Sequence, residues 1–202
     1  MRSPASILHP SNLLTYLSLA AGVGAVAAAL AGSAPAAGLC LAAAALSDTF
    51  DGRFARLFTR NHQLQAAGAE LDSLVDGVAF GAAPIAAIAI LATRAGASAP
   101  WWFWVAGTSY VACAITRLAY YNVAHGDDGP AFVGLPTPVS ALVWSTLLLI
   151  INSWGAMAIA ASILGVAMIT PLRIVRPSGG GLTLFALWPV LLIAAHLARL
   201  RL

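Results

Sequence analysis

The part of this sequence that decides its fold reads Asp48-Thr49-Phe50-Asp51-Gly52-Arg53-Phe54-Ala55-Arg56 and, after residues 57–67, Gly68-Ala69-Glu70-Leu71-Asp72-Ser73-Leu74-Val75-Asp76. These two stretches hold five of the seven acidic residues in the chain, and long apolar runs flank them. A carboxylate at the centre of a membrane helix costs roughly 2.5–3.5 kcal/mol on insertion scales. Four grouped aspartates also repel one another unless a cation neutralises them. Bound divalent metal is the simplest such cation.

The composition is that of a membrane protein. The chain has 202 residues, of which 60% are hydrophobic and only 8% are charged, and its mean hydropathy is +0.88. Soluble domains carry about 25% charged residues, so the composition excludes a soluble globular enzyme. The net charge of +3 comes from ten arginines and no lysine. This charge is too small and too scattered to indicate nucleic-acid binding.

Seven segments are candidate membrane helices, because a helical span needs about 20 mainly apolar residues. They are residues 13–30, 36–46 with a continuation into the aspartate stretch, 66–91, 101–121, 139–151, 156–169 and 182–197. We expect an all-α polytopic protein with six to seven transmembrane helices. The first apolar run lacks a preceding cleavage site and is expected to be a retained span. We expect one catalytic domain over residues 1–202, with residues 48–76 as its core.

The arginines predict the orientation of these spans. Arg53, Arg56 and Arg60 crowd the connection between the second and third spans, and Arg117 and Arg173 fall at span ends on the same side. Arginine collects in short loops on the cytoplasmic side of membranes. The aspartates are therefore expected at the cytoplasmic face of the cell (inner) membrane. The span count stays at six to seven because the arginines at 199 and 201 follow the last segment on the opposite side.

The spacing of the aspartates predicts one shared site. Asp48 and Asp51 are three residues apart, and Asp72 and Asp76 are four apart, so each pair lies on one helix face. The two helices are consecutive and should be antiparallel neighbours, which brings the four carboxylates together. Such hard oxygen ligands suit Mg²⁺, Mn²⁺ or Ca²⁺. Four of them can hold two ions, an arrangement that clamps both sides of a pyrophosphate.

The neighbouring residues favour a phosphate ligand. Gly52 allows close approach to the backbone, Ala55 is small on the same helical side, and Arg56 offers a two-pronged donor for phosphate. Gly68 opens the facing helix. The alternative is a set of solvated helix-end charges, with Glu70 and Asp72 favoured by the dipole of a helix N-terminus. The number and spacing of the acids favour the metal site.

The two stretches resemble the signature of the CDP-alcohol phosphotransferases, membrane enzymes that move a phosphatidyl or similar group from a CDP-linked donor to an alcohol. The resemblance implies two divalent ions (Mg²⁺ or Mn²⁺) on Asp48, Asp51, Asp72 and Asp76, with Asp76 also acting as the general base. It implies CDP-diacylglycerol as donor, and often a homodimer. The donor would contact Asn12, Thr15, Thr49, Gly52, Ala55, Arg56 and Gly68. For Asn12 the alternative is capping of the first helix. The connection at residues 57–67 is longer than is usual in the family.

Flanking segments narrow the choice of acceptor alcohol. Phe80-Gly81-Ala82-Ala83-Pro84 and Phe132-Val133-Gly134-Leu135-Pro136-Thr137-Pro138 resemble the membrane-type phosphatidylserine synthases. That branch has two arginines three apart in the fourth span, whereas this chain has Arg117 followed by Tyr120. Arg117 is the candidate for binding the carboxylate of serine, and the alternative is an arginine that snorkels from a helix end.

Two other functions stay open at the level of sequence. The same chemistry can serve another alcohol, such as glycerol phosphate, an inositol phosphate or a different headgroup. A divalent-cation transporter is the alternative from another class, and it predicts acids at mid-membrane with polar groups on both sides. The opposite side here offers only Arg94 and scattered serine and threonine, which favours the enzyme.

Overall fold

Eight α-helices form most of the part of the chain that the structure describes. The computed structural model describes residues 3–123, 131–150, 153–175 and 180–201. The α-helices are α1 (Leu13–Leu30), α2 (Ala34–Ala55), α3 (His62–Asp76), α4 (Ala83–Arg94), α5 (Trp101–Val123), α6 (Thr137–Ile150), α7 (Trp154–Ile169) and α8 (Gly180–Leu200). Two short 3₁₀ helices, η1 (Pro4–Ile7) and η2 (Pro10–Asn12), precede α1, and a π-helical segment, η3 (Gly77–Ala82), joins α3 to α4. Residue 151, the expected end of the fifth segment, lies outside the described residues.

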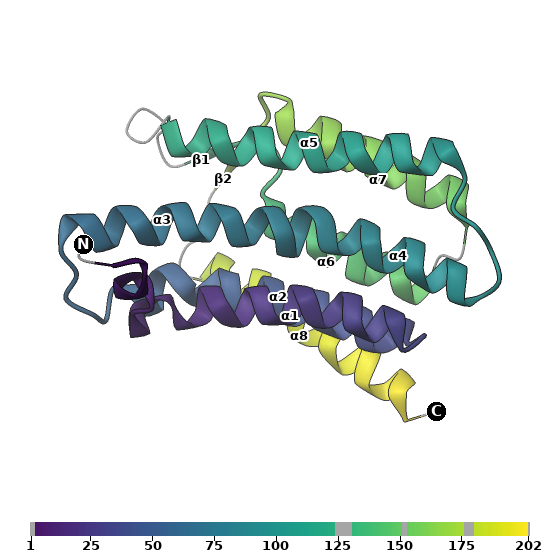
Figure 1. The fold of residues 1–202 in the computed structure, drawn as a ribbon, viewed down its shortest axis with the longest axis horizontal. Coiled ribbons are helices and arrows are strands. Elements are labelled where there is room, and N and C mark those ends of the chain that lie inside the picture. Colours follow the sequence, from purple (N-terminus) through teal and green to yellow (C-terminus); the bar gives the residue numbers. More distant parts are fainter. Residues whose placement is uncertain (1–2, 124–130, 151–152, 176–179, 202) are drawn as a thin grey trace.

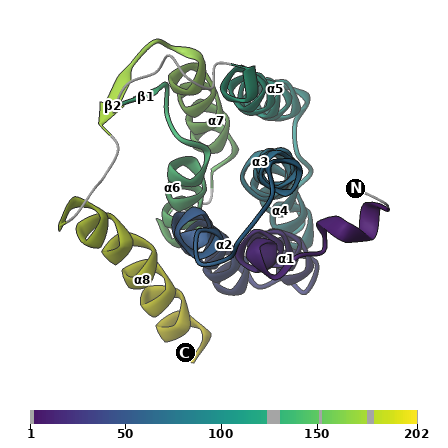
Figure 2. The same ribbon diagram turned by 90° about the vertical axis from the view of Figure 1, so that its left-hand side faces the viewer.

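Most of the helices run roughly along one axis and form a bundle (Figure 1). The α1–α2 turn shows how the local sequence achieves this. Gly32 adopts a left-handed backbone with φ of 78°, which glycine does at little cost, and the Ser33 hydroxyl accepts a hydrogen bond from the N–H of Ala36 at 3.2 Å. α2 therefore returns antiparallel against α1. Viewed along the bundle, α5 lies beside α7, while α8 crosses obliquely on the outside next to α2 and α6 (Figure 2).

α3, η3 and α4 form one continuous rod. The Asn61 side chain caps its start by accepting from the N–H of Leu64 at 2.8 Å, so the helix begins at His62 and not near residue 66. Asp72 and Asp76 consequently lie ten or more residues into the helix. The favourable helix-dipole effect is confined to the first turn. It therefore does not account for Asp72.

The π turn directly after Asp76 is stabilised by a neighbouring helix. Pro84 has no N–H to donate to the carbonyl of Phe80, four residues earlier. Instead the Tyr110 hydroxyl of α5 lies 2.6 Å from that carbonyl oxygen and 2.7 Å from the Ser140 hydroxyl of α6. The Ser140 hydroxyl is in turn 2.7 Å from the carbonyl oxygen of Thr137. The hydroxyls of Tyr110 and Ser140 thus join η3, α5 and α6 through three buried polar contacts.

Among the described residues, three helical stretches are long and apolar enough to cross a membrane: Pro10–Leu30, His62–Arg94 and Gly180–Leu200. α6 and α7 are apolar but shorter, whereas α2 and α5 have 22 and 23 residues. The predicted all-α polytopic membrane fold is confirmed. One small addition was not predicted, a two-stranded antiparallel ladder of β1 (Ala131–Val133) and β2 (Arg173–Val175).

A buried histidine fixes α8 to the bundle. His196 is fully buried, and its Nε2 lies 3.1 Å from the Ser145 hydroxyl of α6. That hydroxyl donates to the carbonyl oxygen of Gly38 in α2 at 2.8 Å. A Cβ on Gly38 would lie 2.1 Å from the imidazole Cε1, so only glycine leaves room for the ring. α8 is therefore held by a specific polar contact as well as by apolar packing.

The contact between α1 and the π turn can be tested by substitution. A Cβ on Gly22 would lie 2.7 Å from both Cα and Cβ of Ala79, and the backbone there cannot easily shift. We expect Gly22→Ala to reduce the free energy of unfolding by roughly 1–3 kcal/mol, as other overpacked cores do. Gly24→Ala is the matched control, because its nearest neighbour is the Cys40 sulfur at 3.4 Å. Thermal unfolding of the two variants in detergent tests this; equal midpoints would contradict the close contact.

Candidate active site

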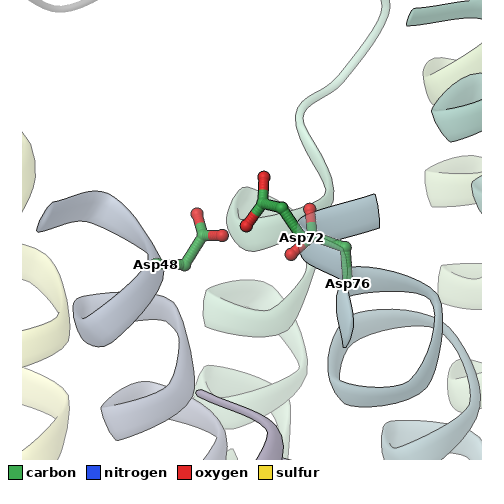
Figure 3. Close-up of side chains that lie close together, drawn as sticks. All are labelled: Asp48, Asp72 and Asp76. Carbon is green, nitrogen blue, oxygen red and sulfur yellow. The ribbon is translucent and has the colours of Figure 1, made fainter. Parts of the chain in front are cut away.

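Three aspartates from the antiparallel helices α2 and α3 (Figure 1) come close together. Asp48 of α2 and Asp72 and Asp76 of α3 each offer one carboxylate oxygen, and these oxygens all lie within 4.8 Å of one another. Figure 3 shows the three carboxylates pointing into the same space. The close approach follows from the spacing of the aspartates and from the antiparallel course of the helices.

Asp51 joins this cluster through Asp72. Asp51 and Asp72 line the same pocket. The Thr15 hydroxyl of α1 donates to Oδ2 of Asp51 at 3.3 Å. All four predicted metal ligands therefore lie in one region, with Asp51 at its edge.

The cluster has the donor set that a hard divalent cation requires. Oδ1 of Asp72 and Oδ1 of Asp76 are buried and have no hydrogen-bond partner. A buried polar atom without a partner costs about 1–3 kcal/mol, and more when it is charged. Carboxylate oxygens at this separation match the preference of Mg²⁺, Mn²⁺ and Ca²⁺ for oxygen ligands. The residues thus fit a metal centre.

Asp76 is held by a residue to which the sequence analysis gave no role. The Thr137 hydroxyl, fully buried at the start of α6, donates to Oδ2 of Asp76 at 2.9 Å. One carboxylate oxygen is therefore fixed and the other is left free. In the sequence, Thr137 stands between Pro136 and Pro138. A single polar residue between two prolines at the start of a helix was the sequence feature that could have indicated this role.

Arg117 of α5 lies near the cluster. Its side chain is only 7% exposed, so it does not snorkel to the surface. Its Cζ lies 4.6 Å from the centroid of the Tyr121 ring, its Nε has no hydrogen-bond partner, and it lies within electrostatic range of Asp48 and Asp76. Tyr120 is 48% exposed, so the position where this chain departs from the expected second arginine contributes no buried group here.

A polar cavity of about 180 Å³ opens beside Asp51 and Asp72. It is lined by Ser11, Asn12, Thr15, Asp51, Gly52, Ala55, Arg60, Gln65, Gly68, Ala69 and Asp72. We call this cavity the donor pocket. Asn12 does not cap α1 with its side chain; its amide donates to the carbonyl oxygen of Ile7 at 3.0 Å.

Two residues predicted to contact the donor lie elsewhere. The Thr49 hydroxyl donates to the carbonyl oxygen of Ala45 in its own helix at 2.7 Å, and Arg56 is exposed and does not line the pocket. The structure brings the other five together: Asn12, Thr15, Gly52, Ala55 and Gly68. It adds Arg60 and Gln65, which sequence reasoning did not assign to the donor.

Fold and site together define a membrane-embedded protein with a carboxylate cluster beside a polar pocket and near a buried arginine. The chain belongs to the CDP-alcohol phosphatidyltransferase family, whose pattern it matches over residues 8–175. It is 37% identical over 152 residues to the CDP-diacylglycerol–serine O-phosphatidyltransferase of Mycobacterium tuberculosis, covering 71% of this chain and 50% of the relative. The protein of that name from Mycobacterium leprae is 39% identical over 154 residues, covering 73% of this chain and 48% of the relative.

An archaeal relative has a related name. The archaetidylserine synthase of Methanothermobacter thermautotrophicus is 34% identical over 144 residues, which cover 71% of this chain and 59% of the relative. The chain spans about half the length of the curated relatives that it matches.

Metal binding by the cluster can be measured directly. Asp72→Asn removes a ligand and a charge from the centre of the site, so we expect Mn²⁺ affinity to fall by roughly tenfold or more. Glu70→Gln is the matched control, since Glu70 is exposed on the same helix and accepts a hydrogen bond from Asn122 at 3.0 Å. Mn²⁺ titration by electron paramagnetic resonance in detergent distinguishes the two. Unchanged affinity in Asp72→Asn would exclude it as a ligand.

Proposed function

We propose that this protein transfers the phosphatidyl group of CDP-diacylglycerol to the hydroxyl of serine and releases CMP. One observation carries the proposal: the carboxylate cluster lies beside a polar pocket and within range of a buried arginine. Asp51 and Asp72 line the donor pocket. Thr137 binds Asp76, and Arg117 lies within electrostatic range of Asp76 and Asp48. A transferase that joins a phosphate donor to an anionic acceptor needs groups of these two kinds close to its reacting atoms.

The reaction balances with the groups present. The serine hydroxyl oxygen bonds to the phosphorus of the phosphatidyl group, the bond from that phosphorus to CMP breaks, and CMP leaves with the bridging oxygen and its electron pair. The hydroxyl proton passes to the carboxylate of Asp76. Two Mg²⁺ or Mn²⁺ ions held by Asp48, Asp51, Asp72 and Asp76 would supply neutralisation of the phosphate charges.

Positioning by the protein supplies much of the acceleration. A carboxylate that also binds metal is a weak base, so orientation and charge neutralisation must lower most of the barrier. Thr137 holds one oxygen of Asp76 in place, which leaves Oδ1 directed into the cluster. The buried guanidinium of Arg117 is suited to the serine carboxylate, because it offers a fork of donors at a desolvated site.

The relatives favour serine among the possible alcohols. Two of them are named serine phosphatidyltransferases and a third an archaetidylserine synthase. A glycerol phosphate or inositol phosphate would also bring an anion to Arg117 and is the alternative acceptor. Membership of a phosphatidyltransferase family favours the enzyme over a cation transporter.

We also propose the cell membrane as the location, with the cluster at the cytoplasmic face. Arg53, Arg56 and Arg60 lie at the same end of the bundle as the aspartates, in agreement with the positive-inside rule. The substrates are then a lipid that reaches the site through the membrane and a water-soluble alcohol from the cytoplasm. The homodimer that the family resemblance implies stays a prediction.

An acceptor panel tests the function. Purified protein with CDP-diacylglycerol and Mn²⁺ is offered serine, glycerol 3-phosphate, inositol 1-phosphate and inositol, and the lipid product is identified by mass spectrometry. We expect phosphatidylserine and an equal amount of CMP with serine alone. Another headgroup in the product would contradict serine as the acceptor, and the absence of CMP release with every alcohol would contradict phosphatidyl transfer.

The role of Arg117 is tested by kinetics. We expect Arg117→Gln to raise KM for serine by roughly tenfold or more, because a charge-assisted hydrogen bond is lost, with little change in KM for CDP-diacylglycerol. Arg117→Lys keeps the charge but not the paired donors of the guanidinium group, and should recover part of the affinity for serine. An equal rise in both KM values would mean that Arg117 supports the structure of the site and does not bind the acceptor.

A further inference from the structure

The donor pocket has one cationic lining residue, Arg60. Its other polar lining groups are two aspartates and the neutral side chains of serine, asparagine, threonine and glutamine. A nucleoside diphosphate brings negative charge along its whole pyrophosphate. Metal ions at the aspartates neutralise only the end that reaches them. The opposite end needs a cation from the protein.

The backbone of Arg60 is fixed by the helix that follows it. The Gln65 side chain donates to the carbonyl oxygen of Arg60 at 3.1 Å, and Asn61 caps α3 immediately afterwards. Both contacts lie between the end of α2 at Ala55 and the first turn of α3, which starts at His62. They fix the backbone at a residue that lines the pocket.

Gly68 gives the Arg60 side chain its space. A Cβ on Gly68 would lie 3.4 Å from Nη1 of Arg60 and 3.3 Å from Oδ1 of Asn12, closer than most real contacts of this kind. The absence of a side chain at residue 68 leaves room for both the guanidinium of Arg60 and the amide of Asn12. Both groups line the same pocket as Asp51 and Asp72.

The two other arginines of this region do not line the pocket. Arg53 and Arg56 belong to the last turn of α2 and its end, and both are exposed. The family motif suggests Arg56 as the phosphate ligand, but the geometry points to the arginine four residues later.

Resting on the proposed function, we propose that Arg60 binds the CMP-side phosphate of the CDP-linked donor. The transferred phosphorus must lie at the aspartates, between the donor pocket and the acceptor side at Arg117. The second phosphate and the nucleoside then extend into the pocket toward Arg60. Guanidinium is matched to this ligand because its donors can bind two phosphate oxygens at once. Arg60 thereby selects a nucleotide-linked lipid over a phospholipid that lacks this second phosphate.

Nucleotide binding in the absence of acceptor tests the proposal. Isothermal titration of CMP, CDP and cytidine into the purified protein in nanodiscs with Mn²⁺ is compared for wild type, Arg60→Gln, Arg60→Lys and Arg53→Gln. We expect Arg60→Gln to lower the affinity for CMP and CDP by roughly tenfold or more, since a charge-assisted contact is lost. The affinity for cytidine should not change. Arg60→Lys should recover part of the affinity, and Arg53→Gln should match wild type. KM for CDP-diacylglycerol should rise in Arg60→Gln, with KM for serine unchanged.

The outcomes separate this proposal from the function on which it rests. CMP binding by Arg60→Gln that equals wild type would overturn the role of Arg60 and leave phosphatidyl transfer intact. Equal weakening of cytidine and CMP would also overturn it, because the effect would then not depend on phosphate. A wild-type protein that binds no cytidine nucleotide would overturn both. Misfolding is checked by the thermal midpoint, which should hold because Gln65 binds the backbone of residue 60 and not its side chain.

Discussion

The crowding of four carboxylates between two helices, with Asp76 buried and the other three half-buried, is the constraint on which the rest of the structure depends. Carboxylates repel one another and lose hydration at such a place, so they persist only where other groups compensate. The protein supplies a few donors, the hydroxyls of Thr15 and Thr137, and leaves Oδ1 of both Asp72 and Asp76 without any. The remaining charge calls for metal. Every other element near the site either holds these acids in position or forms a wall for what binds to them.

The family relationship agrees with this physical requirement. Carboxylates at i,i+3 and i,i+4 on antiparallel helices form a compact oxygen cluster, and a pyrophosphate is the ligand that such a cluster with two ions can hold and polarise. The polar pocket includes Asp51 and Asp72, and a buried arginine stacked on Tyr121 lies within range of Asp48 and Asp76. The names of the mycobacterial and archaeal relatives include serine, the acceptor proposed for this chain.

The sequence was most informative where the signal was local. The spacing of the four aspartates predicted their convergence, and the hydropathy predicted the helical membrane fold. The start of α3 was misplaced because apolar periodicity begins after its polar first turns, although the Asn61 cap was visible. The roles of Thr137 and Arg60 could not be predicted from the sequence, because they depend on how distant parts of the chain pack together. Thr137 is 61 residues from Asp76 along the chain, and the direction of an arginine in a connection is set by neighbours such as Gly68.

The contacts among Phe80, Tyr110, Ser140 and Thr137 complete a ring. Thr137 binds Asp76, Asp76 is followed by the π turn that contains Phe80, and the two hydroxyls close the path back to Thr137. Asp76 is thereby held from α3, η3, α5 and α6, while the donor pocket is lined by residues of η2, α1, α2, α3 and the connection between α2 and α3. The ring shares no residue with the lining of the donor pocket. The position of the proposed base is therefore set independently of the lipid that would occupy the pocket.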